Sequence, residues 1–221
     1  MDHRFPKWLR VVVQKLDFVG IPNLAPLLCA MAGMAFLAKA MGGASVERFL
    51  FDPVLVLQGE WWRLFGFPVS DGLDNPLYLI FYVLYLYFVI NALESHWGPG
   101  PLTVFLGLGY ISALAASFLT MQPLSIWFYI LENVSLAFGT LFPDMELYIY
   151  FVLPVKAKWL AMLAGGYIIF QCLRGGVFVT LFLTITLIPY LLFFSPMLYT
   201  LVRTRYKVAK NRKRFDSDSW R

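Results

Sequence analysis

Apolar runs that approach the length of a membrane span recur along the chain and constrain its fold more than any other feature. A helix needs about 20 mainly apolar residues to cross roughly 30 Å of hydrocarbon. With 60% hydrophobic and only 14% charged residues, the composition excludes a soluble globular domain and a disordered chain. We expect an all-helical, multi-pass membrane protein with six spans, at 24–38, 76–93, 102–121, 126–142, 159–173 and 177–202.

Basic residues divide unequally between the two sides of these spans. The side that holds both termini carries fourteen Lys and Arg residues, and the other side carries four. The positive-inside bias therefore places both termini in the cytoplasm. The predicted domains are an amphipathic interfacial segment (1–22), a transmembrane domain (23–202) and a basic cytoplasmic tail (203–221). We expect the tail to contact membrane lipids and not nucleic acid, because a basic run after a span attracts anionic lipid.

Metal-ligating residues are few and scattered. The two cysteines, Cys29 and Cys172, lie inside apolar runs, and His3 and His96 belong to no motif with metal-ligand spacing. The sequence predicts neither a metal nor any other cofactor.

Two segments between the spans are expected to lie at or in the membrane surface. Residues 42–75 are too rich in turn residues to span and too apolar to float free in water. The segment 143–159 has the pattern of a short amphipathic hairpin. Further along, Arg174 and two glycines predict a tight turn between the fifth and sixth spans, and Pro189 predicts a kink that leaves carbonyls unpaired in the sixth.

Three stretches resemble the rhomboid superfamily of intramembrane serine proteases and their inactive relatives. They are DPVLVLQGEWWRLFGFPVSD (52–71), NPLYLIFYVLYLYFVINALESHWGPG (75–100) and LFPDMELYIYFVLPVKAKWL (141–160). The resemblance implies a six-helix rhomboid-like bundle with a membrane-embedded loop after the first helix. It also implies a structural motif that includes a hydrogen-bonding role for Glu94, and whose residues are Trp62, Arg63, Glu94, Gly98 and Gly100.

The catalytic elements of active rhomboids are missing. Their serine lies in a GxSG box that aligns with 126–129, where this chain has Ile-Trp-Phe-Tyr, and the sixth run contains no histidine. Tyr78 and Tyr82 stand where rhomboids often place oxyanion-binding His and Asn. Because a serine is a weak nucleophile without a base, we predict a pseudoprotease. Ser135 is the one weak candidate for a nucleophile, and we expect it to bond to a carbonyl of its own helix or to a neighbour.

Glu132 and Asn133 place polar groups inside the fourth run. A charge at mid-helix costs about 2.5–3.5 kcal/mol on insertion scales and is typical of a partner or a watery cavity. For Glu132, contact with a client helix, pairing with Arg63, and a protonated or structurally hydrogen-bonded carboxyl are open alternatives.

By its resemblance, the chain is expected to bind transmembrane helices of client membrane proteins. The predicted client-binding residues are Tyr78, Tyr82, Tyr85, Trp127 and Glu132. One alternative is a diverged intramembrane serine protease that uses Ser135 with an unconventional base such as a tyrosine or Glu132. The other is a small transporter that depends on Glu132. The short loops favour a bacterial plasma or inner membrane.

Overall fold

A computed structural model describes residues 20–40, 50–65, 75–149, 153–195, 203–204 and 208. The predicted interfacial segment 1–22 lies almost wholly outside these residues, as do most of the basic tail and half of the segment 42–75.

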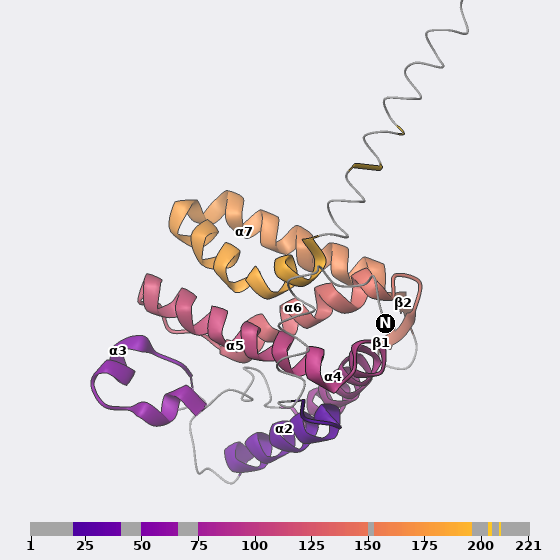
Figure 1. The fold of residues 1–221 in the computed structure, drawn as a ribbon. Helices are drawn as coiled ribbons and strands as arrows, with labels where there is room; N and C mark the ends of the chain where they lie inside the picture. The colour runs from indigo at the N-terminus through magenta and orange to yellow at the C-terminus, as the bar shows by residue number, and fades with distance from the viewer. Residues whose placement is uncertain are drawn as a thin grey trace, which may run out of the picture.

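The described chain is mostly helical, and its helices follow the apolar runs (Figure 1). Only two short strands interrupt the helical order. The elements are α2 (Leu24–Ala40), α3 (Pro53–Leu57), η3 (Trp61–Phe65), α4 (Pro76–Trp97), α5 (Pro99–Thr120), α6 (Ile126–Leu141), β1 (Glu146–Ile149), β2 (Leu153–Lys156) and α7 (Ala157–Thr186).

Helix α7 consists of two helices joined at a sharp turn. Gly176 has φ 70° and ψ −168°, a conformation that favours glycine because it has no Cβ. Figure 1 shows that α7 turns back on itself within its length. The turn predicted after Arg174 is therefore confirmed. We call residues 157–175 the first half of α7 and residues 177–186 its second half.

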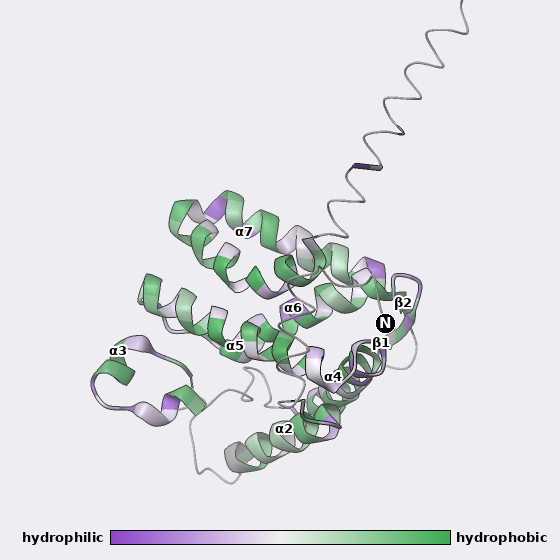
Figure 2. Cartoon of the chain, viewed as in Figure 1, coloured by the Kyte–Doolittle hydropathy of each residue, from purple (hydrophilic) through white to green (hydrophobic). Residues whose placement is uncertain are grey.

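Among the described residues, three helices are long and apolar enough to cross a membrane, namely α4, α5 and α7. Two shorter apolar helices, Leu24–Leu37 and Ile126–Leu141, accompany them. Figure 2 shows the apolar character running along most of each helix. These helices identify the chain as a membrane protein by their length and composition, as the sequence predicts.

Aromatic contacts join the ends of several helices on one side of the bundle. The ring of His96, near the end of α4, lies 5.3 Å from that of Phe142, which follows α6. The ring of Trp97 lies 5.4 Å from that of Phe193, in the helical residues 188–195 that follow α7. Glu94 of α4 bonds to the start of α2 at this end. Consecutive apolar helices therefore run in alternating directions.

Strands β1 and β2 form an antiparallel hairpin between α6 and α7, with Glu146 opposite Lys156. The predicted hairpin is confirmed. Lys158 Nζ lies 3.0 Å from Asp144 Oδ1 beside it. This ion pair lies at the base of the hairpin, where α7 begins.

Small residues allow α6 and the first half of α7 to approach closely. A Cβ at Gly139 would lie 2.3 Å from the Cβ of Ala161 and 2.8 Å from the carbonyl oxygen of Ala157. Both distances are far below van der Waals contact, so a glycine at position 139 is required by this crossing. Close backbone approach at small residues is common where membrane helices associate.

Candidate functional site

Two polar contacts join α4 to α6. Trp127 Nε1 of α6 donates to the hydroxyl of Tyr82, and the hydroxyls of Tyr85 and Ser135 lie 2.6 Å apart. Tyr78 stacks on Tyr82 with ring centroids 6.4 Å apart. The three tyrosines share one face of α4 because they are spaced by four and three residues. That face packs against α6.

Ser135 makes the two kinds of hydrogen bond that the sequence predicts, one to a carbonyl of its own helix and one to a neighbour. Its Oγ donates to the carbonyl oxygen of Leu131, 2.7 Å away, and shares a hydrogen bond with Tyr85. His96 lies at the far end of α4, with its ring against Phe142. Within the described residues, no histidine contacts Ser135, so this serine has no imidazole base there.

The predicted client-binding residues differ in accessibility. Trp127 is 1% exposed and Tyr82 is 8% exposed, so both belong to the α4–α6 core. Tyr78 is 46% exposed, and Glu132 is half-buried. A helix that docks on the surface could touch Tyr78 and Glu132 directly and would reach Trp127 only after a rearrangement. Client binding by these residues stays a prediction.

The contacts of Arg63 exclude one of the alternatives for Glu132. Its Nε lies 2.5 Å from Glu60 Oε2, and its Nη1 donates to the carbonyl oxygen of Leu50 at 2.9 Å. Arg63 is the buried residue of η3. The pairing of Arg63 with Glu132 is therefore wrong, because a local acid and a local carbonyl hold the guanidinium.

The α3–η3 segment is built locally and attached to α5. Asp52 caps α3 by accepting from the backbone N–H groups of Val54 and Leu55, and Pro53 provides the first helical residue.

Two contacts attach this segment to the rest of the bundle. Phe51 forms a backbone bridge with Leu124, in the loop between α5 and α6. Tyr110 of α5 donates to a carbonyl of η3. Trp62 is 57% exposed on this segment.

Glu94 joins the end of α4 to the start of α2. Its two carboxylate oxygens accept from the backbone N–H groups of Asn23 at 2.7 Å and Leu24 at 3.1 Å. The structural hydrogen-bonding role predicted for Glu94 is confirmed by these bonds. Gly98 ends α4 with φ 89°, and its N–H donates to the carbonyl of Glu94. Gly100 is buried in the first turn of α5.

Asn133 closes a break in the last apolar run. The break lies at Leu187, and residues 188–195 are again helical. In an unbroken helix the N–H of Tyr190 would bond to the carbonyl of Thr186. Instead Asn133 Nδ2 donates to that carbonyl at 2.8 Å, and Asn133 Oδ1 accepts from Tyr190 N at 3.3 Å. Asn133 is 2% exposed.

The kink expected from Pro189 is therefore present, and one carbonyl beside it has a partner from another helix. The Thr186 carbonyl is not left unpaired, because a side-chain amide from α6 replaces the missing backbone partner. Tyr190 also bonds to Thr140 through its hydroxyl, at 2.9 Å. The sequence identifies Asn133 as unusual but contains no signal that pairs it with residues more than fifty positions away.

One arc of α6 is left open between its neighbours. Trp127 and Ser135 face α4, whereas Leu136 packs with Ile168 of the first half of α7. At about 100° per residue, Phe128 and Glu132 lie between these two sides. Phe128 is 51% exposed. Helices α4 and α7 both pack on α6 but scarcely touch each other. We call Phe128 and Glu132 the open arc.

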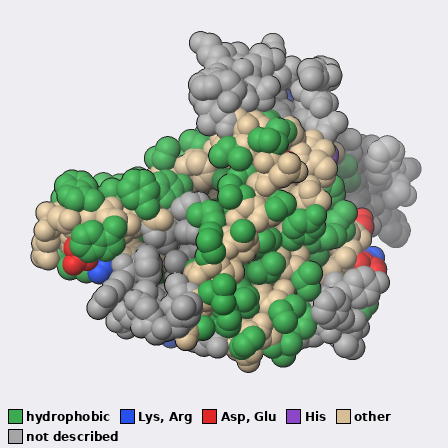
Figure 3. Space-filling view, turned by 90° about the horizontal axis from the view of Figure 1, so that it is seen from below, with side chains coloured by type: hydrophobic (Ala, Val, Ile, Leu, Met, Phe, Trp, Pro, Cys, Tyr) green, Lys and Arg blue, Asp and Glu red, His purple; other side chains and the backbone are tan. Residues whose placement is uncertain are grey.

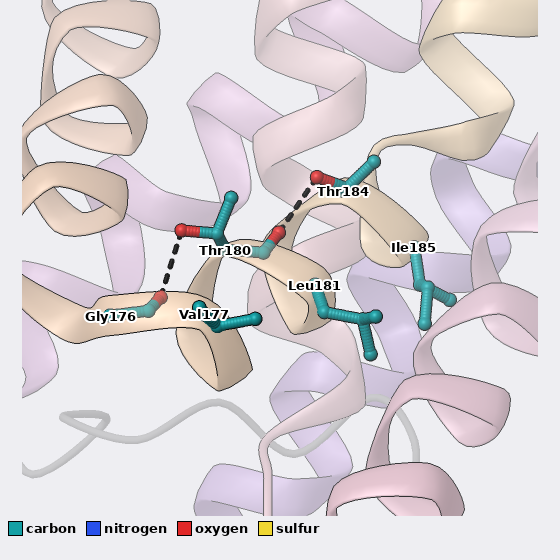
Figure 4. Close-up of a pocket in the computed structure, with 6 residues that line it drawn as sticks. All are labelled: Gly176, Val177, Thr180, Leu181, Thr184 and Ile185. Carbon is teal, nitrogen blue, oxygen red and sulfur yellow. Dashed lines mark hydrogen bonds between the residues drawn. The ribbon is translucent and has the colours of Figure 1, made fainter.

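A shallow groove of about 560 Å³ runs along the second half of α7 (Figure 4). Thr180 and Thr184 donate to carbonyls of their own helix, at 2.9 Å and 2.7 Å. The remaining side chains are apolar, so the groove offers a ligand little beyond apolar contact. Its lining residues are Gly176, Val177, Thr180, Leu181, Thr184 and Ile185.

The outer surface agrees with a hydrocarbon environment. Figure 3 shows a face covered largely by apolar side chains, on which the visible charged side chains lie at the edges. Within the described ranges, no three His, Cys, Asp or Glu side chains lie together in a way that could hold a metal ion.

No protein-family model, no curated protein and no solved structure matches this chain. The case for a function therefore depends on the residues and contacts described above.

Proposed function

We propose that this chain is a catalytically inactive, rhomboid-like membrane protein that binds transmembrane segments of other membrane proteins. In this proposal six segments cross a bacterial plasma or inner membrane, and both termini are cytoplasmic. The alternating directions of the apolar helices and the placement of Lys156 and Lys158 at the end where α2 begins support this topology.

The observation that carries the proposal is the open arc of α6. Interior helices of a bundle are normally covered on all sides, but Phe128 is half exposed between α4 and α7. A single membrane-spanning helix that entered there would contact α6 and both flanking helices. Tyr78 of α4, also half exposed, would lie on its path. Apolar packing and lipid release drive such association in a bilayer.

The contacts of Ser135 support the non-catalytic part of the proposal. A nucleophilic serine needs a base within hydrogen-bond reach. Ser135 has instead a backbone carbonyl and a tyrosine hydroxyl. The protease alternative would depend on the Tyr85 hydroxyl as the base of Ser135, and a protonated phenol is a poor proton acceptor. No described contact of Glu132 favours the transporter. Some transporters bind their substrate at a broken helix. At the break near Pro189, however, the carbonyl of Thr186 already accepts a hydrogen bond from Asn133.

A binding measurement in vesicles tests the proposal. The purified protein, labelled with an acceptor dye, would be mixed in phosphatidylcholine vesicles with a donor-labelled single-span peptide of Leu and Ala. We expect energy transfer that saturates with peptide and weakens in Phe128→Ala and Tyr78→Ala. Ile111→Ala is the matched control, because Ile111 is 62% exposed on α5, away from the open arc. Energy transfer no greater than for random mixing would contradict the proposal.

A further inference from the structure

Glu132 differs from the other polar side chains of α6. Asn133, Ser135 and Thr140 all make hydrogen bonds inside the protein. The carboxyl of Glu132 has no hydrogen bond or ion pair with any described residue, and Arg63, the candidate partner from the sequence, is bound to Glu60. A carboxyl in a spanning helix is costly when no partner offsets its lost hydration.

The depth of Glu132 is set by its position in α6. It is the seventh of the sixteen residues of this helix, so it lies about 9 Å along the axis from Ile126. Phe128 lies one turn earlier on the same side and is half exposed. The carboxyl therefore lies on the open arc, between α4 and the first half of α7, and in the proposed topology this level is within the membrane layer.

The first half of α7 supplies a polar flank at the same level. It runs antiparallel to α6, with Ala157 and Ala161 opposite Gly139. Glu132 lies seven residues before Gly139 in α6. The residues of α7 at the same level therefore lie about seven residues after Ala161, near Tyr167 and Gln171. These two side chains bond to each other at 2.8 Å. Neither bonds to Glu132.

We infer that Glu132 selects client helices that carry a lysine or arginine within the membrane. This inference rests on the proposed function and names the chemistry of its partner. A carboxylate in hydrocarbon is stabilised by a positive charge beside it. A lysine or arginine within a spanning helix is stabilised by a carboxylate for the same reason. The aliphatic stem of a lysine or arginine can reach the carboxyl while the helix backbone packs beside Phe128.

The test compares three single-span peptides in the vesicle binding assay. One is the apolar Leu and Ala peptide, one carries a lysine at the level of Glu132, and one carries that lysine near its end. We expect the first lysine peptide to bind roughly tenfold more tightly than the apolar peptide, as for a favourable interhelical polar contact. Glu132→Gln should remove this preference, so that the lysine peptide and the apolar peptide bind equally to the variant.

Glu146→Gln is the matched control, because Glu146 is an exposed acid on β1. It should leave the preference intact, and the lysine near the peptide end should give none. Equal binding of the apolar and lysine peptides, or a preference that survives Glu132→Gln, would overturn the inference while the proposed function stands. Failure of every peptide to bind would overturn both. Saturable binding of the apolar peptide by Glu132→Gln, at whatever affinity, shows that this variant is folded.

Discussion

Asn133 Nδ2 lies 2.8 Å from the carbonyl oxygen of Thr186 and donates a hydrogen bond to it. The same amide accepts from the N–H of Tyr190, so one side chain of α6 replaces one backbone hydrogen bond of the last apolar run. Ser112 of α5 lies 3.5 Å from the Thr186 carbonyl. Three helical segments thus meet at one carbonyl in the interior of the bundle.

Replacing Asn133 by Ala should destabilise the protein by about 1–3 kcal/mol, because a buried carbonyl and a buried N–H lose their partner. The free energy of unfolding in detergent micelles measures this loss. Asn91→Ala is the control, since Asn91 is exposed on α4. If the two variants unfolded alike, the amide of Asn133 would not support the break at Leu187.

Gly139→Ala should cost about 1–3 kcal/mol, because the new Cβ would collide with Ala157 and Ala161 and force α6 from α7. The same unfolding measurement applies. Gly165→Ala provides the control, since a Cβ at this helical position meets nothing within 4 Å. That variant should be neutral or more stable, by up to about 1 kcal/mol. Equal losses in both variants would refute the close crossing at Gly139.

Glu94→Ala should destabilise the chain by about 0.5–2 kcal/mol, the usual cost of losing a side chain that caps a helix start. The start of α2 would be affected first, because Asn23 and Leu24 donate to this carboxylate. Hydrogen exchange of these two amides should become faster in the variant. Unchanged exchange would mean that α2 is held at this end by packing alone.

The pKa of Asp144 lies below its ordinary value, because Lys158 donates a hydrogen bond to its carboxylate and the positive charges of Lys158 and Lys156 add to the effect. The stabilisation is present above the unfolded pKa of about 3.9 and is lost as pH falls through the lower folded pKa. A carboxyl NMR titration of Asp144 checks the direction. Lys158→Met should raise this pKa, and no rise would contradict the ion pair.

Ser135 should not react with a fluorophosphonate probe, either in detergent or in liposomes, because its hydroxyl has no imidazole base among the described residues. An active rhomboid serves as the positive control. Labelling of the wild type that disappears in Ser135→Ala would show an activated serine and refute the non-catalytic account.

Local rules predicted the elements of this fold better than their contacts. The apolar runs, the turn at Gly176 and the hairpin at 146–156 follow from hydropathy and from residues with special backbone freedom. Pairing of Arg63 with Glu132, one of the alternatives left open by the sequence, is not formed, because a nearby acid, Glu60, competes well with any distant one.

The candidate site was only partly predictable. The sequence singles out Tyr78, Tyr82 and Tyr85 as sharing a face, but not that Tyr82 is buried against Trp127. Periodicity defines which side chains share a face of a helix, whereas the neighbour that covers the face depends on tertiary packing. For the same reason the exposure of Phe128 could not be read from the fourth run.

The most direct test of client binding is photo-crosslinking in the native membrane. A benzophenone amino acid would replace Phe128 in the open arc and, as the control, Ile111 on α5. The account predicts adducts from position 128 to the transmembrane segments of other proteins, located by mass spectrometry, and no such adducts from position 111. An absence of protein adducts at position 128, or the same adducts from both positions, would contradict it.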